Sequence, residues 1–348
     1  MTAHSNTTAG PPVAAMFDLL ATAWVPHAIH AAAVLGIADS LTSGASDAAA
    51  VAQAAATDEN ATARLLRALV TIGLVQHEPD DTYALTDVGA LLATDAPGSL
   101  RHPVLLGGSD AAQRAWGQFV DCVRTGRTAT SLLDGTEDPF AAYTTDPDAQ
   151  ATFDAAMAEA TRHIAGPIND AYRFPDIGTI TDIGGGHGTL LATILHAHPN
   201  LAGVVIDREH CRPGAETTIA AAGLADRYRF VAADFFTDDL PPADIAVLKS
   251  VLHDWDDDGA TTLLANVRRT IPPHGRLLVI EAVIPDQLEP TSAHRRMIWA
   301  DLRMLIATGG RERTRAEYDA LLAAAGFQVA TITPTSAGLD IIEATPTS

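Results

Sequence analysis

The stretch TITDIGGGHGTLLATILH, residues 179–196, determines how the second half of this 348-residue chain folds. It begins with the β-branched and apolar run Thr179–Ile183, which is typical of a short buried strand. Four of the next five residues, Gly184–Gly188, are glycine, so the backbone can turn sharply and approach a ligand closely there. Leu, Ala and Ile then recur at helical spacing from Thr189 to His196. The stretch therefore predicts a strand, a tight turn and a helix.

The alternation of strands and helices continues toward the C-terminus. Helices are predicted at Thr189–His196, around Ala215–Ala222, around Ala260–Thr270 and at His294–Ile306. The predicted strands are Thr179–Ile183, Gly203–Ile206, Tyr228–Ala232, Ile245–Leu248 and Arg276–Ile280, with closing strands at Gln328–Thr333 and Leu339–Ala344. This alternation predicts an α/β fold with a parallel sheet covered on both faces. Ligands of such sheets bind beyond the carboxyl ends of the strands, near the point where strand order reverses.

Three successive strands end in residues that suit an adenosine group. The first is followed by the glycine turn and a helix, whose free amides and positive dipole end favour ligand binding. The second ends in Asp207, whose carboxylate can accept hydrogen bonds from both ribose hydroxyls. The third is followed by Asp234 and Phe235, which offer one polar contact and an aromatic face for adenine. We therefore expect an adenosine pocket at this edge of the sheet.

The spacing of the glycines indicates which adenosine cofactor is bound. A dinucleotide fold favours GxGxxG, whereas this chain has Gly184-x-Gly186-x-Gly188 with Asp182 just before it. Asp182 would repel a pyrophosphate, and no second Arg or Lys clamp for one is present. The sequence therefore favours S-adenosylmethionine, which carries a zwitterionic amino-acid tail, over NAD.

Residues 1–100 are predicted to form a mostly helical domain, because apolar residues recur at helical spacing from Ala14 to Leu41 and from Ala48 to Leu74. The segment around Asp80–Thr86 adds a small β-wing, which completes a winged-helix pattern. Two basic residues against ten acidic ones give this region a charge of −8, the wrong sign for DNA binding. Its Ala-rich apolar faces suit packing on a second copy instead. A helical connector is expected over 101–175, and the second domain over 176–348.

The whole chain has 22 basic and 43 acidic residues, a formal charge of −21, which disfavours nucleic acid and anionic membrane surfaces as partners. Cys122 and Cys211 are its only cysteines and form no CxxC motif, so no disulfide framework or structural zinc site is expected. Residues 1–12 lack the features of a signal peptide and are expected to be a disordered arm. These features predict a cytoplasmic protein.

Four segments of the sequence together resemble one enzyme family. They are Asp182–Gly188, Ala233–Phe236, the run Leu248-Lys-Ser-Val-Leu-His-Asp-Trp-Asp-Asp257, and Gly309-Gly-Arg-Glu-Arg-Thr314. The chain resembles the S-adenosylmethionine-dependent O-methyltransferases of the caffeate/hydroxyindole type, including bacterial enzymes that methylate polyketide and phenazine products. The resemblance covers nearly the whole chain. It implies an N-terminal winged-helix dimerisation domain, a Rossmann-like class I methyltransferase domain, and a homodimer in which the partner subunit helps to close the pocket.

The resemblance also implies roles for individual residues. His253 would be the general base that deprotonates a phenolic hydroxyl, and Glu281 and Glu312 would orient it. A His of ordinary pKa, about 6.5, can take the proton of a phenol as its oxygen attacks the methyl group. Because the donor carries a positively charged leaving group, no metal is expected. Lys249 and Ser250 would lie at the cofactor, and the expected substrate contacts are Phe153, Met157, Trp255, Asp301 and Met304.

Several questions stay open from the sequence alone. After the carboxylate that binds the ribose, here Asp207, the family usually has a proline followed by a valine. This chain has Arg208–Cys211 there instead, so the loop can be shaped differently. Some relatives bind the cofactor without the histidine, and a few catalyse hydroxylation or decarboxylation. A non-enzymatic alternative is a winged-helix regulator that senses S-adenosylmethionine. The sequence does not identify the acceptor, its regiochemistry, or whether an amine or carboxylate could replace the phenol.

Overall fold

The computed structural model describes residues 12–347. The disordered arm expected at residues 1–12 lies, apart from Pro12, outside the described residues. The chain divides after Ser109 into two compact units. This boundary falls inside the helical connector expected over 101–175.

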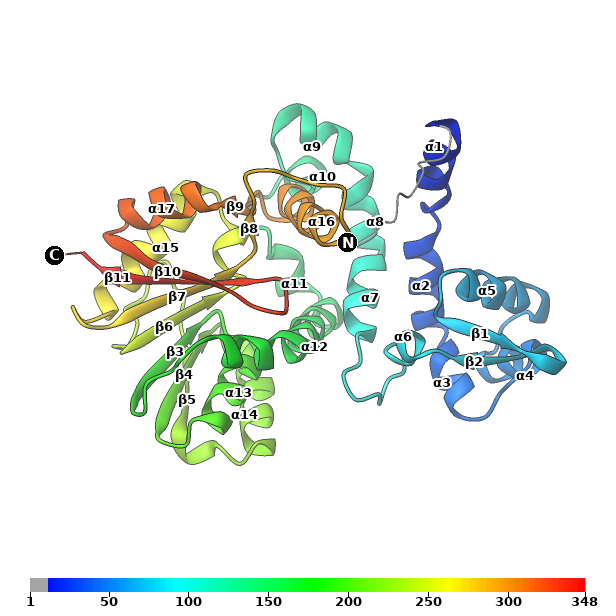
Figure 1. The fold of residues 1–348 in the computed structure, drawn as a ribbon, viewed down its shortest axis with the longest axis horizontal. Helices are drawn as coiled ribbons and strands as arrows, with labels where there is room; N and C mark the ends of the chain where they lie inside the picture. Colours follow the sequence, from blue (N-terminus) through cyan, green and yellow to red (C-terminus); the bar gives the residue numbers. More distant parts are fainter. Residues whose placement is uncertain (1–11, 348) are drawn as a thin grey trace, which may run out of the picture. The chain divides into compact units, whose positions relative to one another are not determined.

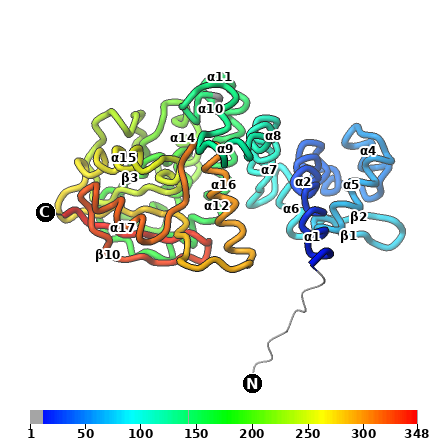
Figure 2. The backbone as a smooth tube through the Cα atoms, turned by 90° about the horizontal axis from the view of Figure 1, so that it is seen from above, coloured from blue at the N-terminus to red at the C-terminus, as the bar shows by residue number. Residues whose placement is uncertain are grey.

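The first unit contains helices and one hairpin (Figure 2). Its elements are α1 (Pro12–Ala21), α2 (Val25–Val34), α3 (Ile37–Thr42), α4 (Ala48–Ala55), α5 (Glu59–Thr71), β1 (Val75–Glu78), the 3₁₀ turn η1 (Pro79–Asp81), β2 (Thr82–Leu85), α6 (Asp87–Ala90) and α7 (Arg101–Gly108). Two of these helices begin at aspartates whose side chains accept a backbone N–H, Asp47 from Ala50 and Asp58 from Ala61. Helices α4 and α5 with the antiparallel β1–β2 pair form the predicted winged helix.

Helix α1 of the first unit exposes a row of large apolar side chains. Among the described residues, one stretch, Pro12–Val34, is long and apolar enough to cross a membrane by length and composition. It is divided into α1 and α2, and α1 has no buried residue. The large exposed side chains of α1 are Val13, Met16, Phe17, Leu19 and Leu20.

The second unit is built around a seven-stranded sheet (Figure 1). Before the sheet come α8 (Asp110–Gly117), α9 (Phe119–Thr125), α10 (Ala129–Asp134), α11 (Ala141–Thr145) and α12 (Pro147–Ala171). The first half of the sheet contributes β3 (Gly178–Ile183), α13 (Thr189–Ala197), β4 (Leu201–Asp207), η2 (Glu209–Cys211), α14 (Arg212–Ala221), η3 (Ala225–Arg227) and β5 (Tyr228–Ala232). The second half contributes β6 (Ile245–Lys249), η4 (Leu252–Asp254), α15 (Asp257–Thr270), β7 (Arg276–Glu281), β8 (Val283–Ile284), α16 (Ser292–Ala307), β9 (Arg313–Thr314), α17 (Arg315–Ala324), β10 (Phe327–Pro334) and β11 (Asp340–Pro346).

The strand order is β10-β11-β7-β6-β3-β4-β5. The ladders from β7 to β5 are all parallel, whereas β11 is antiparallel to both of its neighbours. The chain moves outward from β3 through β4 to β5 and then returns to β6 on the other side of β3. The order therefore reverses between β3 and β6, and the carboxyl ends of these strands are the expected ligand-binding edge.

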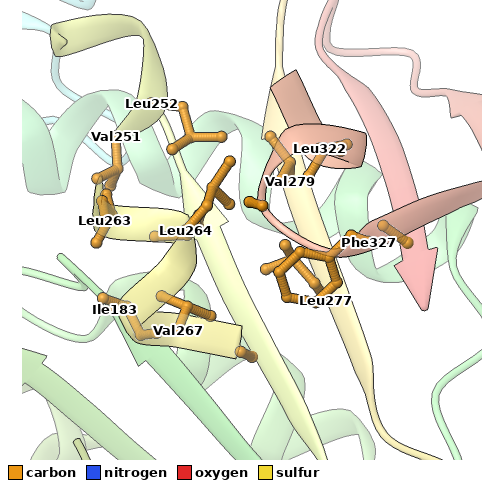
Figure 3. Close-up of a cluster of buried hydrophobic side chains, with 14 of the residues drawn as sticks. Ile183, Val251, Leu252, Leu263, Leu264, Val267, Leu277, Val279, Leu322 and Phe327 are labelled. Carbon is orange, nitrogen blue, oxygen red and sulfur yellow. The ribbon is translucent and has the colours of Figure 1, made fainter. Parts of the chain in front are cut away.

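Apolar cores cover both faces of the sheet. Leu263, Leu264 and Val267 of α15 pack with Leu322 and Phe327 on one face (Figure 3). A second cluster packs α12, α13 and α14 on the other face, so the sheet strands are buried on both sides as the sequence predicts. The predicted strands and helices of this unit are all present, with ends that differ by a few residues.

Candidate active site

The glycine turn lies at the carboxyl end of β3, where the backbone takes conformations that favour glycine. Gly184, Gly186 and Gly188 have φ values of +72°, +53° and +69°. A Cβ at Gly184 would lie 2.8 Å from Val251 Cγ2, and one at Gly185 would lie 2.7 Å from the Asp182 carboxyl group. The turn is therefore closed tightly over its neighbours, and its glycines cannot be replaced without strain or displacement.

Asp207 ends β4, the strand beside β3, and its carboxylate is held by the glycine turn. Its Oδ2 accepts the Gly186 N–H at 2.7 Å, and its Oδ1 accepts the Arg208 N–H at 2.7 Å. The Arg208–Cys211 departure noted in the sequence forms the short turn η2, which leads directly into α14. The half-buried Asp207 carboxylate is thus fixed at the point where the sequence places the group that binds the ribose hydroxyls.

The third strand end places an aromatic ring beside the same turn. The Phe235 Cε1 atom lies 3.9 Å from the position of a Gly184 Cβ. Asp234 is exposed, and its Oδ1 accepts the Phe236 N–H at 2.8 Å. A glycine turn from β3, a fixed carboxylate from β4 and an aromatic ring after β5 therefore converge. This combination of groups suits an adenosine.

Asp182 of β3 is buried and interacts electrostatically with half-buried Lys249 of the neighbouring strand β6. Burial raises the pKa of Asp182 to about 7, although the Lys249 ammonium beside it opposes this. Burial also lowers the pKa of Lys249, whose Nζ donates to Thr161 Oγ1 of α12 at 3.2 Å. Ser250, the next residue, has φ +54°, a left-handed conformation that is uncommon for a residue with a side chain.

His253, Glu281 and Glu312 meet in one place, as the family resemblance implies. His253 Nδ1 lies 2.9 Å from Glu312 Oε1 and 3.4 Å from Glu281 Oε2. Both carboxylates are buried, and Oε2 of each has no hydrogen-bond partner among the described residues. His253 Nε2 lies 3.8 Å from Asp254 Oδ1 and is the ring nitrogen not engaged by the two glutamates.

The sheet explains why three residues so far apart in sequence converge. Strands β6 and β7 pair in parallel, so the turn η4 after β6 lies beside Glu281 at the end of β7. Glu281 Oε1 accepts the Val251 and Leu252 N–H groups at 2.9 and 3.0 Å, which fixes the backbone of η4. The short parallel pair β8–β9 then joins the residues after Glu281 to Arg313, next to Glu312.

Arg313 supports the His253 turn and was not singled out by the sequence argument, although it lies within the quoted Gly309–Thr314 segment. Its side chain is fully buried and donates to Leu252 O at 3.0 Å and to Trp255 O at 2.9 Å. It also donates to Asp257 Oδ1, at 3.0 Å through Nε and at 2.9 Å through Nη2. Arg313 therefore holds the turn that carries His253 at both of its ends.

The surroundings of His253 in this structure favour a higher pKa than the ordinary value assumed from the sequence. Burial lowers the pKa of the imidazole, but the carboxylates of Glu281, Asp254 and Glu312 outweigh burial and raise the pKa to about 10. Burial raises the pKa of Glu281 to about 7, although the positive His253 opposes it. Three carboxylates around one ring stabilise its charged form, which spacing along the sequence does not reveal.

Two of the expected substrate residues belong to a group of aromatic rings. Phe153 of α12 lies 4.6 Å from Tyr143 and 6.2 Å from Phe140, between ring centroids. Phe140 is also 6.0 Å from Trp255, which follows η4. Phe140 thus links the two candidates. The Trp255 Nε1 is buried without a partner among the described residues.

The other three expected substrate residues have different surroundings. Met157 lies one helical turn from Phe153 on α12 and is half-buried. Asp301 of α16 accepts the Glu312 N–H at 2.9 Å through Oδ1, so it holds the segment that carries Glu312. Met304 is buried, and its sulfur accepts a contact from Thr308 Oγ1 at 3.8 Å. Arg303, on the same helix, carries a charge that interacts with Tyr143 and Asp254.

The side chains of His253, Glu281 and Glu312 are close enough together to bind a metal ion. One ligand atom from each of His253, Glu281 and Glu312 lies within 4.8 Å of the other two. Glu281 Oε1, however, already accepts two backbone N–H groups. The expectation that this site uses no metal stays a prediction.

Comparison with protein families identifies what kind of enzyme this geometry belongs to. A model described as the O-methyltransferase domain matches residues 116–328, and one described as the O-methyltransferase dimerisation domain matches residues 17–95. The chain belongs to the O-methyltransferase family. The fold is accordingly a class I methyltransferase domain preceded by a dimerisation domain, as the sequence predicts.

Relatives of this O-methyltransferase come mainly from bacterial natural-product biosynthesis. The phenazine O-methyltransferase PhzM of Lysobacter antibioticus is 34% identical over 99% of this chain and 100% of the relative. The O-demethylpuromycin-O-methyltransferase of Streptomyces alboniger is 39% identical over 86% of this chain and 80% of the relative. The 8-amino-8-demethylriboflavin N,N-dimethyltransferase of Streptomyces davaonensis is 33% identical over 92% of this chain and 91% of the relative.

Solved structures agree with these relationships. The crystal structure of LaPhzM superimposes with a TM-score of 0.90 at 34% identity and covers 97% of this chain and 100% of that one. The O-methyltransferase NcsB1 from neocarzinostatin biosynthesis, in complex with S-adenosylmethionine and 2-hydroxy-5-methyl naphthoic acid, superimposes with a TM-score of 0.79 at 32% identity. It covers 98% of this chain and 99% of that one. The methyl donor of this O-methyltransferase is S-adenosylmethionine.

Proposed function

We propose that this O-methyltransferase methylates a phenolic hydroxyl of a flat aromatic small molecule of secondary metabolism, with His253 as the general base. The observation that carries the proposal is the arrangement of the His253 ring. Its Nδ1 faces Glu312 Oε1 at 2.9 Å and Glu281 Oε2 at 3.4 Å, so both carboxylates lie at the same nitrogen. Nε2 is then the nitrogen that can exchange a proton with an acceptor.

The donor would be held at the carboxyl ends of β3, β4 and β5. Asp207 would bind the ribose hydroxyls, Gly184 and Gly186 would allow the backbone to approach the donor, and Phe235 would lie against the adenine. Asp182 of β3 and Asp234 after β5 complete the proposed site, together with Lys249 and Ser250 at the end of the neighbouring strand β6. When bound, S-adenosylmethionine supplies a methyl group on a positively charged sulfur, which is a good leaving group.

His253 would act by holding and then moving a proton at Nε2. The positive sulfur of the bound donor would disfavour the charged form of the ring and so lower the His253 pKa from its raised value of about 10. The neutral ring could then accept the phenolic proton at Nε2, and the carboxylates of Glu281 and Glu312 at Nδ1 would stabilise the imidazolium that forms. A positioned base of this kind contributes typically about 10²–10⁴-fold to a rate. Because His253 lies on a turn held by Glu281 and Arg313, the ring needs little reorganisation when the acceptor arrives.

The acceptor would be bound by the aromatic group around Phe153 and Trp255. Contacts of 4.6–6.2 Å between ring centroids link Tyr143 to Phe153, Phe153 to Phe140, and Phe140 to Trp255, and these rings offer flat apolar surfaces to a flat molecule. Met157 adds a polarisable thioether, and Asp301 and Met304 of α16 complete the proposed substrate contacts. One relative is named a phenazine O-methyltransferase, and another was solved in complex with 2-hydroxy-5-methyl naphthoic acid, which supports this class of substrate.

An aromatic amine is the second candidate acceptor. The 33% identical relative named as an N,N-dimethyltransferase supports it. A neutral aromatic amine attacks the methyl group through its nitrogen lone pair and loses its proton only afterwards. It therefore depends less on a general base than a phenol does. Comparison of matched phenol and aniline acceptors therefore separates the two candidates, because only phenol methylation should fall sharply in the His253→Ala variant.

We further propose that the protein is a cytoplasmic homodimer. The dimerisation-domain match at 17–95 includes the second half of α1, whose large apolar side chains Phe17, Leu19 and Leu20 are exposed in the single chain. Burial of such a surface against a second copy explains its composition without a membrane. Sedimentation or light scattering should give twice the mass of one chain, and charged substitutions at Phe17 and Leu20 should weaken the dimer. The −8 charge of residues 1–100 predicts no binding to DNA in a low-salt mobility-shift assay.

The test of the proposed function has two steps. Calorimetric titration with S-adenosylhomocysteine measures donor-site binding, and a screen of phenolic polyketides, flavonoids and phenazines by mass spectrometry then detects methylated product. Binding together with a methylated phenol is the expected result. Binding without any methylated product would favour a member that catalyses hydroxylation or decarboxylation, and no binding would overturn the donor site.

A further inference from the structure

A second group of metal-binding side chains lies outside the His253 site. It consists of Asp154 from α12, His187 from the glycine turn, and His210 and Cys211 from η2. Asp154 Oδ2 is 3.9 Å from His187 Nε2 and 3.8 Å from His210 Nε2. One ligand atom from each of Asp154, His210 and Cys211 lies within 4.8 Å of the other two. We call these four residues the Asp154 cluster.

The two distances from Asp154 to the imidazoles are close to those between ligand atoms of a tetrahedral metal site. Zinc bonds of about 2.0–2.3 Å place neighbouring ligand atoms roughly 3.3–3.7 Å apart, and the distances at Asp154 are 3.8 and 3.9 Å. His187 lies outside the group whose ligand atoms are all within 4.8 Å of one another, so its ring must rotate to join Asp154, His210 and Cys211 at one ion. Asp154 and Cys211 are largely buried, whereas the His210 side chain is 36% exposed. A cation can therefore enter from the His210 side.

The surrounding backbone restricts the His187 ring. A Cβ at Gly214 of α14 would lie 2.3–2.6 Å from three atoms of that ring. Only glycine at this position leaves room for the imidazole, so the ring is packed against the start of α14. Cys211 directly precedes that helix. Three of the four residues are thus placed by one compact region of the structure, and Asp154 approaches it from α12.

The cluster also lacks positive charge. Burial raises the pKa of Asp154, and the nearby Asp207 raises it further, although His210 and His187 oppose this. Burial, together with Asp207 and Asp154, raises the pKa of the Cys211 thiol. A divalent cation bound by one carboxylate, one thiolate and two neutral imidazoles would make a site with no net charge. The thiol would release its proton to solvent on binding, because metal coordination deprotonates thiols.

We propose that Asp154, His187, His210 and Cys211 bind one borderline divalent cation, such as Zn²⁺ or Co²⁺. Imidazole and thiolate ligands favour these ions over Mg²⁺ and Ca²⁺, which prefer oxygen. The sequence argument against a zinc site considered spacing along the chain, and the fold brings Asp154 and His187 to the adjacent pair His210-Cys211. The proposal concerns binding at this cluster and does not depend on the proposed methyl acceptor or on the role of His253.

The experiment is a titration of the untagged, metal-free full chain with CoCl₂, followed by absorbance. One equivalent of Co²⁺ should give a thiolate-to-cobalt charge-transfer band in the near ultraviolet and visible bands typical of tetrahedral cobalt. One equivalent of Zn²⁺ should remove both. Cys211→Ser should abolish the charge-transfer band, whereas Cys122→Ser, the matched thiol control, should retain it. His210→Ala should weaken binding at least tenfold, and His196→Ala, the exposed histidine control, should not.

Three results would overturn the proposal. They are the absence of saturable cobalt binding, a charge-transfer band that persists in Cys211→Ser, and equal effects of His210→Ala and His196→Ala. Circular dichroism and thermal melting must first establish that each variant is folded. If Cys211→Ser does not fold, the cobalt affinities of His210→Ala and His196→Ala still test the proposal. His210 is exposed, so its replacement leaves the core unchanged.

Discussion

Glu312 Oε1 lies 2.9 Å from His253 Nδ1, and this contact assigns different roles to the two nitrogens of the ring. Nδ1 is occupied by a buried carboxylate, so in the proposed mechanism Nε2 is the nitrogen that exchanges a proton with the acceptor. The contact joins η4, which follows β6, to the residue before β9. It therefore exists only because the β8–β9 pair brings these two segments together.

Replacement of His253 by Ala should lower methyl transfer to a phenol by about 10²–10⁴-fold, because the positioned base is lost. S-adenosylhomocysteine affinity should stay within a factor of two or three of that of the wild type, roughly 0.5 kcal/mol, since the ring lies apart from the glycine turn. Turnover and calorimetry check these values, with His196→Ala as the control. Unchanged turnover would remove His253 from the mechanism and leave alignment of the reactants as the source of the rate.

Replacement of Glu312 by Gln should lower the pKa of His253, because a hydrogen-bonded negative charge is removed from Nδ1 while the shape of the side chain is kept. NMR titration of the His253 ring measures the change. The pH dependence of kcat/KM should move to lower pH in the same variant, whereas ionisation of the acceptor would not move. A His253 pKa equal to that of the wild type would contradict the role given to Glu312.

The stability of the donor-free protein should depend on His253 at alkaline pH. Its folded-state pKa of about 10 exceeds the ordinary value of 6.5. The stabilisation is therefore fully present below about pH 6.5 and is lost as the pH rises through about 10. The difference in unfolding free energy between wild type and His253→Gln, measured with denaturant from pH 6 to 10, should shrink as the pH rises. A constant difference would show that the pKa is not raised.

Replacement of Arg313 by Met should lower the unfolding free energy by about 2–4 kcal/mol, because the carbonyls of Leu252 and Trp255 lose buried hydrogen bonds. Turnover should fall more than donor affinity, since the turn that carries His253 loosens. Arg315→Ala is the matched control, because that side chain is exposed and its replacement should cost less than about 0.5 kcal/mol. Equal melting temperatures for the two variants would refute this role.

Replacement of Gly310 by Ala should displace the His253 turn. A Cβ at Gly310 would lie 2.0 Å from His253 O and 2.5 Å from Asp254 C, so one backbone segment must shift. A misplacement of about 1 Å can cost on the order of 10²-fold in rate. Gly117→Ala is the control, because a Cβ there meets no atom within 4 Å. Steady-state kinetics of the two variants should differ by at least tenfold in kcat.

Much of the donor site could be predicted from local patterns. Short apolar runs and helical spacing predicted the strands and helices from residue 179 onward. Parallel strands share one carboxyl edge, so Asp207, Asp234 and the glycine turn were expected to lie together. The family resemblance added His253, Glu281 and Glu312. These predictions rest on residues a few positions apart or on motifs, and neither requires knowledge of long-range packing.

Other features depend on packing between distant segments. Arg313 has no spacing signal, because its partners are backbone carbonyls of a turn about sixty residues earlier in the chain. The raised pKa of His253 depends on how many carboxylates surround it and how deeply they are buried, and no sequence spacing specifies this.

The sequence by itself determined the order of strands and helices, the glycine turn and the type of residue at each strand end, because these follow from local backbone geometry and periodicity. Only the tertiary structure decided which nitrogen of His253 is free and that Asp154 meets His187, His210 and Cys211. The physical reason is that desolvation and charge act over distances in space. Their strength at one side chain depends on neighbours supplied by other strands and helices.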